Sequence, residues 1–214
     1  MTEASATFST DQAAPYPIRL EIDRPQKQSR ITNFPLFIGT FIRGLLVIPH
    51  LVILYFFQLA ANIIFFIATF AILFSGRYPE GLFRFYVGYQ RWVVNVYAYL
   101  CHLYDSYPPF SPDQVEGYPV RFEVDSPARL SRLLNAPILG LIIKTILAIP
   151  HFIVLTFLSF VAIVVIFIAQ FAILFTGSFP AGMHSFLVGV GRWSLRVTGY
   201  IYALTDRYPP FSLS

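Results

Sequence analysis

The stretch LVILYFFQLAANIIFFIATFAILF, residues 51–74, and its echo FIVLTFLSFVAIVVIFIAQFAILF, residues 152–175, decide how this chain can fold. Each run contains no charged side chain. About 20 consecutive apolar residues are enough for an α-helix to cross the hydrocarbon core of a bilayer, so both runs are long enough. The alternative is a pair of buried helices in a soluble protein, but 214 residues cannot cover two such helices on every side. We therefore predict a membrane protein.

The composition agrees with this prediction. Hydrophobic residues make up 56% of the chain and charged residues only 12%, about half the proportion in soluble domains. The net charge is +4, but no Lys/Arg cluster of the kind that binds nucleic acid is present. Attraction to anionic lipid headgroups explains the basic balance better, so we expect the lipid bilayer and not nucleic acid as partner. The single cysteine, Cys101, excludes an intramolecular disulfide and a cysteine-based metal site.

The chain contains two tandem copies of one unit. YPIRLEID at 16–23 matches YPVRFEVD at 118–125, and YPPFS at 107–111 matches YPPFS at 208–212. Between them, both copies have a basic residue six positions before a Pro-His step, then FAILF followed by a small hydroxyl residue and glycine, then PxG and Arg-Trp. We define copy one as residues 16–112 and copy two as residues 118–214. Residues 1–15 are expected to form a short disordered tail without a signal peptide.

This set of motifs resembles DUF4389, a bacterial membrane family, over nearly the whole chain and as two domains. The resemblance implies a bacterial membrane protein. It supplies no catalytic or binding residues, because the function of the family is unknown.

Within each copy, strict alternation of apolar and charged residues over 18–23 and 120–125 predicts a short, half-buried β-strand. The two strands could pair as a small ribbon. The apolar segment that follows has two possible arrangements, which the sequence leaves open. Either Pro49 kinks it and residues 51–74 form one span, or residues 36–57 and 59–74 form a helical hairpin. Residues 82–103 predict an amphipathic aromatic helix.

The fold class that we predict is therefore mainly α: a polytopic membrane protein of two homologous repeats. Each repeat has a short β-strand, a Pro-kinked apolar helical segment and an amphipathic aromatic helix. An even number of crossings per repeat would put the equivalent basic motifs of both copies on one side, as the positive-inside rule requires. We thus expect two crossings per repeat, in the bacterial cytoplasmic (inner) membrane, with both termini cytoplasmic.

Six repeated polar residues are candidates for function. His50 and His151 follow a proline in each copy and could meet at a repeat interface to bind a metal or relay protons, or could simply stabilise the kink. Four cations could contact lipid phosphate or another anion, although such residues often snorkel to the interface. They are Arg43, Lys144, Arg91 and Arg192.

The strand carboxylates are expected to form a solvated face with Arg19 and Arg121, and Asp105 and Asp206 to cap or pair with nearby cations. No catalytic motif with a known mechanism is present, so we expect neither enzymatic activity, nor a cofactor, nor a metal site. A lipid-modifying enzyme would rest only on the paired histidines and arginines.

Two functions from different classes therefore compete. The first is a non-enzymatic integral membrane scaffold or accessory subunit, which packs with other membrane subunits or with itself. The second is a lipid-binding or small-solute transport protein with a site at the repeat interface, because many transporters are built from duplicated units. The polar residues deep in the apolar runs would line that site. They are Gln58, Asn62, Ser159 and Gln170.

Overall fold

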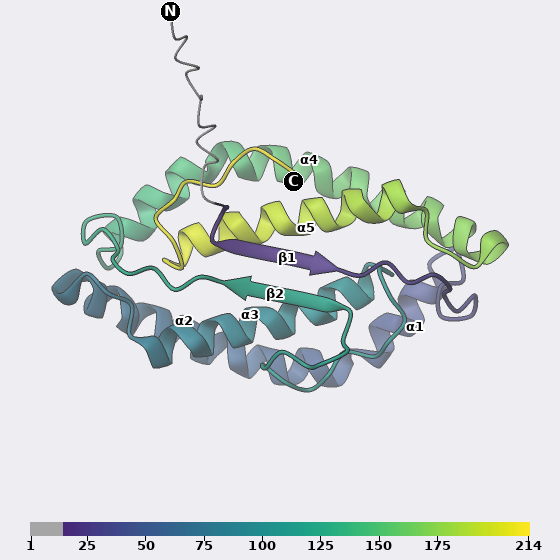
Figure 1. Cartoon of the computed structure of the whole chain (residues 1–214), viewed down its shortest axis with the longest axis horizontal. Coiled ribbons are helices and arrows are strands. Elements are labelled where there is room, and N and C mark those ends of the chain that lie inside the picture. Colours follow the sequence, from purple (N-terminus) through teal and green to yellow (C-terminus); the bar gives the residue numbers. More distant parts are fainter. Residues whose placement is uncertain (1–14) are drawn as a thin grey trace, which may run out of the picture.

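The computed structural model of the chain describes residues 15–214 and is mainly helical, with one short strand in each copy, as expected (Figure 1). The predicted tail, residues 1–15, lies outside the described residues except for Pro15. The elements in chain order are β1 (Ile18–Ile22), α1 (Ile38–Leu46), α2 (Ile48–Ser75), α3 (Glu80–Leu100), β2 (Val120–Val124), α4 (Leu139–Thr176) and α5 (Ala181–Ile201).

The apolar segment of each copy forms one long helical rod. Helix α2 runs without interruption through residues 58–62, so the helical hairpin that the sequence left open is wrong. In copy one the rod is broken only at Val47, two residues before Pro49, whereas in copy two α4 continues through Pro150. Gly76 and Gly177 end the two rods at φ of 70° and 75°, a left-handed conformation that glycine adopts without strain.

The two strands pair with each other as an antiparallel ribbon, which confirms the expected pairing. Leu20 lies opposite its own equivalent in copy two, Phe122, so an approximate twofold axis passes through the middle of the ribbon. One face of the ribbon buries Ile18, Leu20 and Phe122 against the helices. The other face carries alternating charges that pair across the strands: Arg19 with Glu123 and Asp125, and Arg121 with Glu21 and Asp23.

Each strand packs on a helix of the other copy. Strand β1 of copy one contacts α5, and β2 of copy two contacts α3. The linkers that follow the strands make the same exchange: the Gln28 N–H donates to the Gly177 carbonyl at 2.8 Å, and the Leu130 N–H to the Gly76 carbonyl at 2.9 Å. Strand and linker exchange therefore ties the two copies into one unit.

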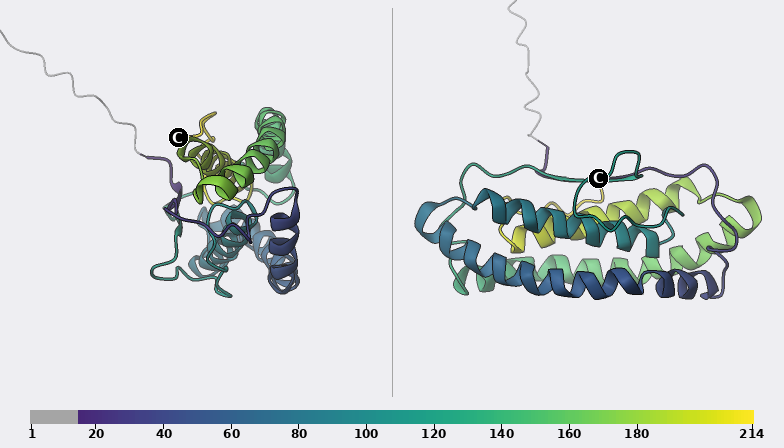
Figure 2. Two further views of the ribbon diagram at one scale, coloured as in Figure 1. Left: turned by 90° about the vertical axis from the view of Figure 1, so that its right-hand side faces the viewer. Right: turned by 90° about the horizontal axis from the view of Figure 1, so that it is seen from below.

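The elements form three layers (Figure 2). The charged ribbon is the first layer, α3 and α5 are the second, and α1, α2 and α4 are the third. The core lies mainly around the second layer, where most side chains of α3 and α5 are buried against the ribbon on one side and the long helices on the other. The third layer has its outer side open.

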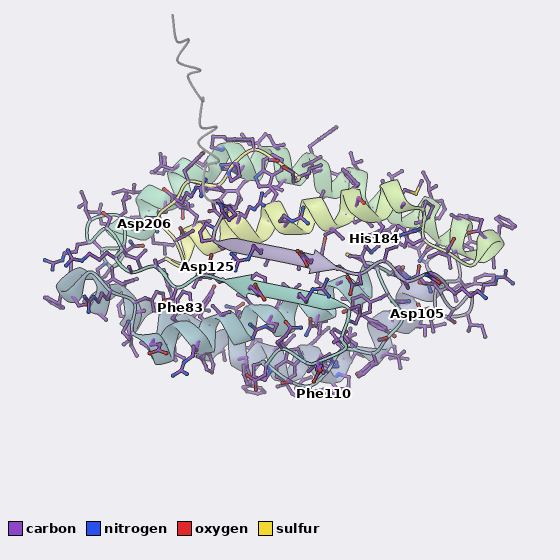
Figure 3. All side chains as sticks on the ribbon, viewed as in Figure 1. Phe83, Asp105, Phe110, Asp125, His184 and Asp206 are labelled. Carbon is purple, nitrogen blue, oxygen red and sulfur yellow. The ribbon has the colours of Figure 1, made fainter. Side chains whose placement is uncertain are left out.

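The twofold arrangement makes the copies antiparallel, which corrects one sequence expectation. Asp105 and Asp206 are equivalent residues, yet they lie at opposite ends of the molecule (Figure 3). If the long helices crossed a membrane, equivalent motifs of the two copies would therefore lie on opposite sides of it, not on one side as the sequence predicts. Strand pairing turns one copy around, and a count of apolar segments along the chain does not reveal this.

The two ends of the molecule differ in one polar network. At the end where α1 begins and α4 ends, the Gln170 side-chain amide donates to the Thr40 hydroxyl at 2.9 Å and lies 3.1 Å from His102 Nε2. His102 Nδ1–H donates to Asn33 Oδ1 at 2.8 Å, and Nε2 accepts from Thr40 at 3.0 Å. At the other end the residues equivalent to Gln170, Thr40 and His102 are, in that order, Thr69, Leu141 and Ala203. Gln170 therefore joins the two copies at one end only.

The network predicts a pH dependence of stability. Burial, together with the nearby Arg43 guanidinium, lowers the pKa of His102 to about 3, from 6.5 in the unfolded chain. The unfolded state thus binds a proton between these values when the folded state does not, so the free energy of unfolding should fall as pH drops from about 6.5 toward about 3. Urea unfolding in detergent micelles at a series of pH values measures this slope.

His102→Asn is the matched variant, since asparagine tolerates the left-handed backbone at this position, φ 60°, and does not titrate. The slope should become smaller but not vanish, because burial also lowers the pKa of His184, and hydrogen bonds from arginines lower the pKa of Asp23 and Asp125. An unchanged slope in His102→Asn would contradict the assignment.

Candidate functional site

Arg43 lies at the centre of a buried cluster at one end of the molecule. It is 0% exposed, although it belongs to a helix with an otherwise uncharged sequence. Its guanidinium donates to the carbonyls of Tyr99 and Tyr104, each at 2.6 Å, and to the carboxylate of Asp105 at 2.5 Å. The ring of Tyr99 also lies under the guanidinium, at 4.4 Å. The charge is thus neutralised and hydrogen-bonded inside the protein, as a buried ion requires.

Asn33 completes this cluster. Its Oδ1 accepts from Arg43 at 2.9 Å, and its amide group donates to Asp105 Oδ1 at 2.8 Å. Gly39 in the first turn of α1 allows the Asn33 turn to lie this close, because a Cβ at Gly39 would be only 2.8–2.9 Å from the backbone of residues 32–34. The backbone of residues 32–34 therefore packs directly on the backbone of α1, beside the Arg43 guanidinium.

Copy two repeats the cluster with a lysine at the other end of the molecule. Lys144 is 1% exposed and donates to Asn135 Oδ1 at 2.7 Å and to Asp206 Oδ1 at 3.0 Å. The Asn135 amide group donates to Asp206 at 2.8 Å, and Gly140 provides the same close approach as Gly39. The expectation that Asp105 and Asp206 pair with nearby cations is confirmed.

These contacts place Arg43 and Lys144 inside the protein, away from the lipid-facing surface where the sequence analysis put them. Neither Asn33 nor Asn135 was among the candidate site residues. A signal for both was present: Ser-Arg-x-x-Asn occurs at 29–33 and again at 131–135. In each case the serine backbone N–H donates to the aspartate of the same cluster.

Arg91 and Arg192 hold the ribbon to the helices. Arg91 on α3 donates to the Phe122 carbonyl of β2 at 3.2–3.3 Å, and Arg192 on α5 donates to the Leu20 carbonyl of β1 at 3.0–3.2 Å. Each also donates to a carbonyl of the segment after YPPF, that of Pro112 or Leu213. The arginine of each Arg-Trp pair therefore anchors the central residue of the other copy's strand.

The same arginines line two equivalent open grooves beside the ribbon, of about 740 and 730 Å³. Carboxylates line these grooves too, among them Glu123 and Asp125 in the first and Glu21 and Asp23 in the second. Hydrogen bonds from Arg121 and Arg19 lower the pKa of Asp23 and Asp125, so both remain ionised near neutral pH. The grooves thus contain both signs of charge.

His50 and His151 directly follow Pro49 and Pro150 in the long helices but are not brought together. His50 Nδ1 accepts a hydrogen bond from the Trp92 indole at 2.9 Å, and its ring stacks on Phe110 at 3.8 Å. His151 has the same contacts within copy two, with Trp193 at 3.0 Å and Phe211 at 3.9 Å. The two histidines therefore lie in separate aromatic clusters, one within each copy.

Tyrosine, not histidine, bonds the helix backbone just before each proline. The hydroxyl of Tyr107 donates to the Leu46 carbonyl at 2.7 Å, and that of Tyr208 to the Leu147 carbonyl at 2.9 Å. In each copy the tyrosine of YPPF therefore bonds the long helical rod, and its phenylalanine stacks on the histidine. Trp92 and Trp193 are buried within these clusters, so they are not exposed interfacial anchors.

The long helices leave a large apolar surface open, which we call the outer face: the exposed side chains of α1, α2 and α4. Helices α2 and α4 are each long and apolar enough to cross a membrane, and only 17% of the most hydrophobic window of each is buried. The low fraction distinguishes them from core helices of a soluble protein. Arg43 and Lys144 are the charged residues of these three helices, and both are buried, so the outer face has no charged side chain.

The cation clusters predict a difference between removing and exchanging the cation. Arg43→Met removes the positive charge that pairs with Asp105 and the side-chain donor to the carbonyls of Tyr99 and Tyr104, so we expect a loss of about 3–5 kcal/mol in the free energy of unfolding. Arg43→Lys should cost less, because Lys144 fills the equivalent position. Urea unfolding in detergent micelles measures both, and equal losses would contradict a role for the charge in pairing with Asp105.

Comparison with known proteins gives a family for the chain. A family model described as a domain of unknown function, DUF4389, matches residues 38–111 and again residues 139–212. Neither the curated proteins nor the solved structures gave a match. The matched regions contain the long apolar helix, the helix that follows it and the YPPF segment, whereas the strands precede them. The chain belongs to the DUF4389 family and contains two tandem family domains.

Proposed function

We propose that the protein is a non-enzymatic membrane protein of the bacterial inner membrane, acting as a scaffold or accessory subunit. The outer face is the observation that carries this proposal. A monomeric soluble protein rarely exposes an apolar patch larger than a few hundred Å². Here two long helices, of about 42 and 57 Å at 1.5 Å per residue, expose Leu, Ile and Phe along their whole length and expose no charged side chain.

The contacts of the repeated polar residues support a role without catalysis, because all of these contacts stabilise the fold. Arg43 and Lys144 neutralise carboxylates, Arg91 and Arg192 hold strands, and His50 and His151 accept hydrogen bonds from tryptophans. Each of these residues is part of the architecture of one copy or of the exchange between copies. Their recurrence in both copies is accounted for by folding.

The first experiment follows the full-length chain in its own membrane. We expect it to remain in the membrane fraction after a wash at high salt and high pH, which removes peripheral proteins. Native mass spectrometry after gentle extraction should then find a defined homo-oligomer or a complex with larger subunits. A solitary monomer in the extracted sample would contradict the scaffold role while leaving the membrane location intact.

Two equivalent phenylalanines of the outer face provide the matched variant. Phe56 and Phe157 are 62% and 68% exposed, and replacing both with Glu should release folded chain from the membrane or prevent its insertion. Arg84→Glu, which changes an exposed residue of α3, should leave membrane retention unchanged. Equal behaviour of the two variants would contradict contact between the outer face and the membrane interior.

A cavity between the copies supports the second candidate function, a lipid-binding or small-solute protein with a site at the repeat interface. The cavity has a volume of about 280 Å³ and lies between α3 and α5, under Leu20 of the ribbon. Gln90, Ser194 and Thr198 supply polar groups, while Val93 and Leu195 supply apolar surface. Ser159 of α4 lines it as well. Gln170 does not line it, because its amide is engaged with Thr40 and His102.

Ser194→Leu fills this cavity and tests the second candidate. If a lipid or small solute binds there, native mass spectra of the wild type should show a bound small molecule, and Ser194→Leu should lose it. Ser185→Leu adds the same side chain to an exposed position of the same helix and should retain the adduct. An adduct that persists in both variants would place the molecule elsewhere.

A further inference from the structure

We propose that the protein lies flat in one leaflet of an anionic bilayer, with the outer face among the acyl chains and the charged ribbon in water. The proposal rests on the membrane association proposed above. It names the orientation of the molecule and the lipid chemistry that holds it. Four observations carry it, and each concerns a different part of the molecule.

The first observation is the separation of charge between opposite surfaces. The outer face has no charged side chain, whereas the ribbon side of the molecule carries six charged residues in two ion-pair groups. Arg19 pairs with Glu123 and Asp125, and Arg121 pairs with Glu21 and Asp23. Between the two surfaces lie α3 and α5, which are mostly buried (Figure 2). A molecule with one apolar surface and one charged surface on opposite sides fits a bilayer surface, where apolar groups lie beneath the headgroups and charges above them.

The second observation is the position of the ribbon along the helices. The strands run parallel to the helices and lie near their middle (Figure 1). If the helices crossed the bilayer, the ribbon would lie at mid-depth with its charged side chains facing lipid. Arg121 and Glu123 are at least 45% exposed at their side chains, so the protein itself does not cover them. Charged side chains at that depth normally face a protein interior or a water-filled cavity.

The third observation is size. At 1.5 Å per residue α4 is about 57 Å long, and α1 with α2 is about as long, whereas the hydrocarbon core is about 30 Å thick. A helix is about 10–12 Å in diameter with its side chains. One layer of helices therefore fits within the acyl chains of one leaflet, which are about 15 Å deep.

The fourth observation is the basic linkers. Lys27 and Arg30 lie in the linker that bonds Gly177 at the end of α4, and their equivalents, Arg129 and Arg132, lie in the linker that bonds Gly76 at the end of α2. These two helix ends are at opposite ends of the molecule (Figure 1). All four are exposed. In a crossing orientation the two pairs would lie on opposite sides of the membrane, against the positive-inside rule. In the flat orientation all four reach the headgroups of the same leaflet, where anionic lipids attract them.

Cysteine accessibility distinguishes the two orientations. Ser75 and Thr176 are equivalent exposed residues at the ends of α2 and α4, and Glu123 lies in the middle of the ribbon. Each is replaced in turn by cysteine in a full-length Cys101→Ala background. Bacterial spheroplasts that produce each variant are treated with a membrane-impermeant maleimide before and after lysis.

The flat orientation predicts the same result for all three positions: each is labelled in intact spheroplasts, or each only after lysis. Labelling of Ser75→Cys and Thr176→Cys from opposite sides, or a Glu123→Cys that stays protected after lysis, would overturn the flat orientation and favour a crossing one. If the variants leave the membrane fraction, or form soluble dimers through the outer face, the proposed membrane function itself fails. The two failures are therefore distinguishable.

Discussion

The antiparallel pairing of two equivalent strands is the constraint on which the rest of this structure depends. A two-stranded ribbon is marginally stable alone in water, and both of its strands are edges. Here the buried side of the ribbon packs on α3 and α5, and Arg91 and Arg192 satisfy carbonyls at its centre. Because each strand belongs to one copy and lies on a helix of the other, the copies cannot separate without breaking the ribbon.

The twofold relation then determines where every other feature lies. Pairing a strand with its own equivalent in antiparallel sense rotates copy two by half a turn about an axis that passes between Leu20 and Phe122. Both long helices thereby come to the same side of the molecule, opposite the ribbon. The two buried cation clusters come to opposite ends, around Asp105 and Asp206 (Figure 3). A single charged surface and a single uncharged surface are thus consequences of the symmetry.

The sequence predicts local features well, because short-range patterns carry them. Alternation over residues 18–23 predicts the strands and their solvated carboxylates, and the charge-free runs predict the long helices. The relative direction of the copies is not encoded in any such pattern, since it arises from pairing between residues about 100 positions apart. Short-range patterns do not reveal the roles of Asn33 and Asn135 for the same reason, because both residues bond aspartates more than 70 positions away.

The predicted surroundings of Arg43 and of the two histidines differ from the structure for a related reason. A lone cation in an apolar sequence indicates either snorkelling or lipid contact when only its own helix is considered. Arg43 does neither, because the loop after α3 returns to the same end of the molecule and brings Asp105 with it. The histidines were considered as a pair because they recur, but recurrence in an antiparallel duplication separates equivalent residues unless they lie near the axis. Leu20 and Phe122 are such residues, and His50 and His151 are not.

The departures from symmetry identify where the copies have specialised. Arg43 occupies the position of Lys144, and only the Arg43 end adds His102, Gln170 and Thr40 to its cluster. A guanidinium presents its donors in a fixed fork and reaches four carbonyl or side-chain acceptors besides Asp105, whereas an ammonium is a compact charge and reaches two. The Arg43 end therefore contains the larger polar network, in which Gln170 of copy two bonds Thr40 of copy one. At the Lys144 end Leu141 and Ala203 replace Thr40 and His102, and the copies are joined there by Tyr16, whose hydroxyl donates to the Arg207 carbonyl at 2.8 Å. The two ends are therefore closed by different contacts, although the ribbon that joins the copies is nearly symmetric.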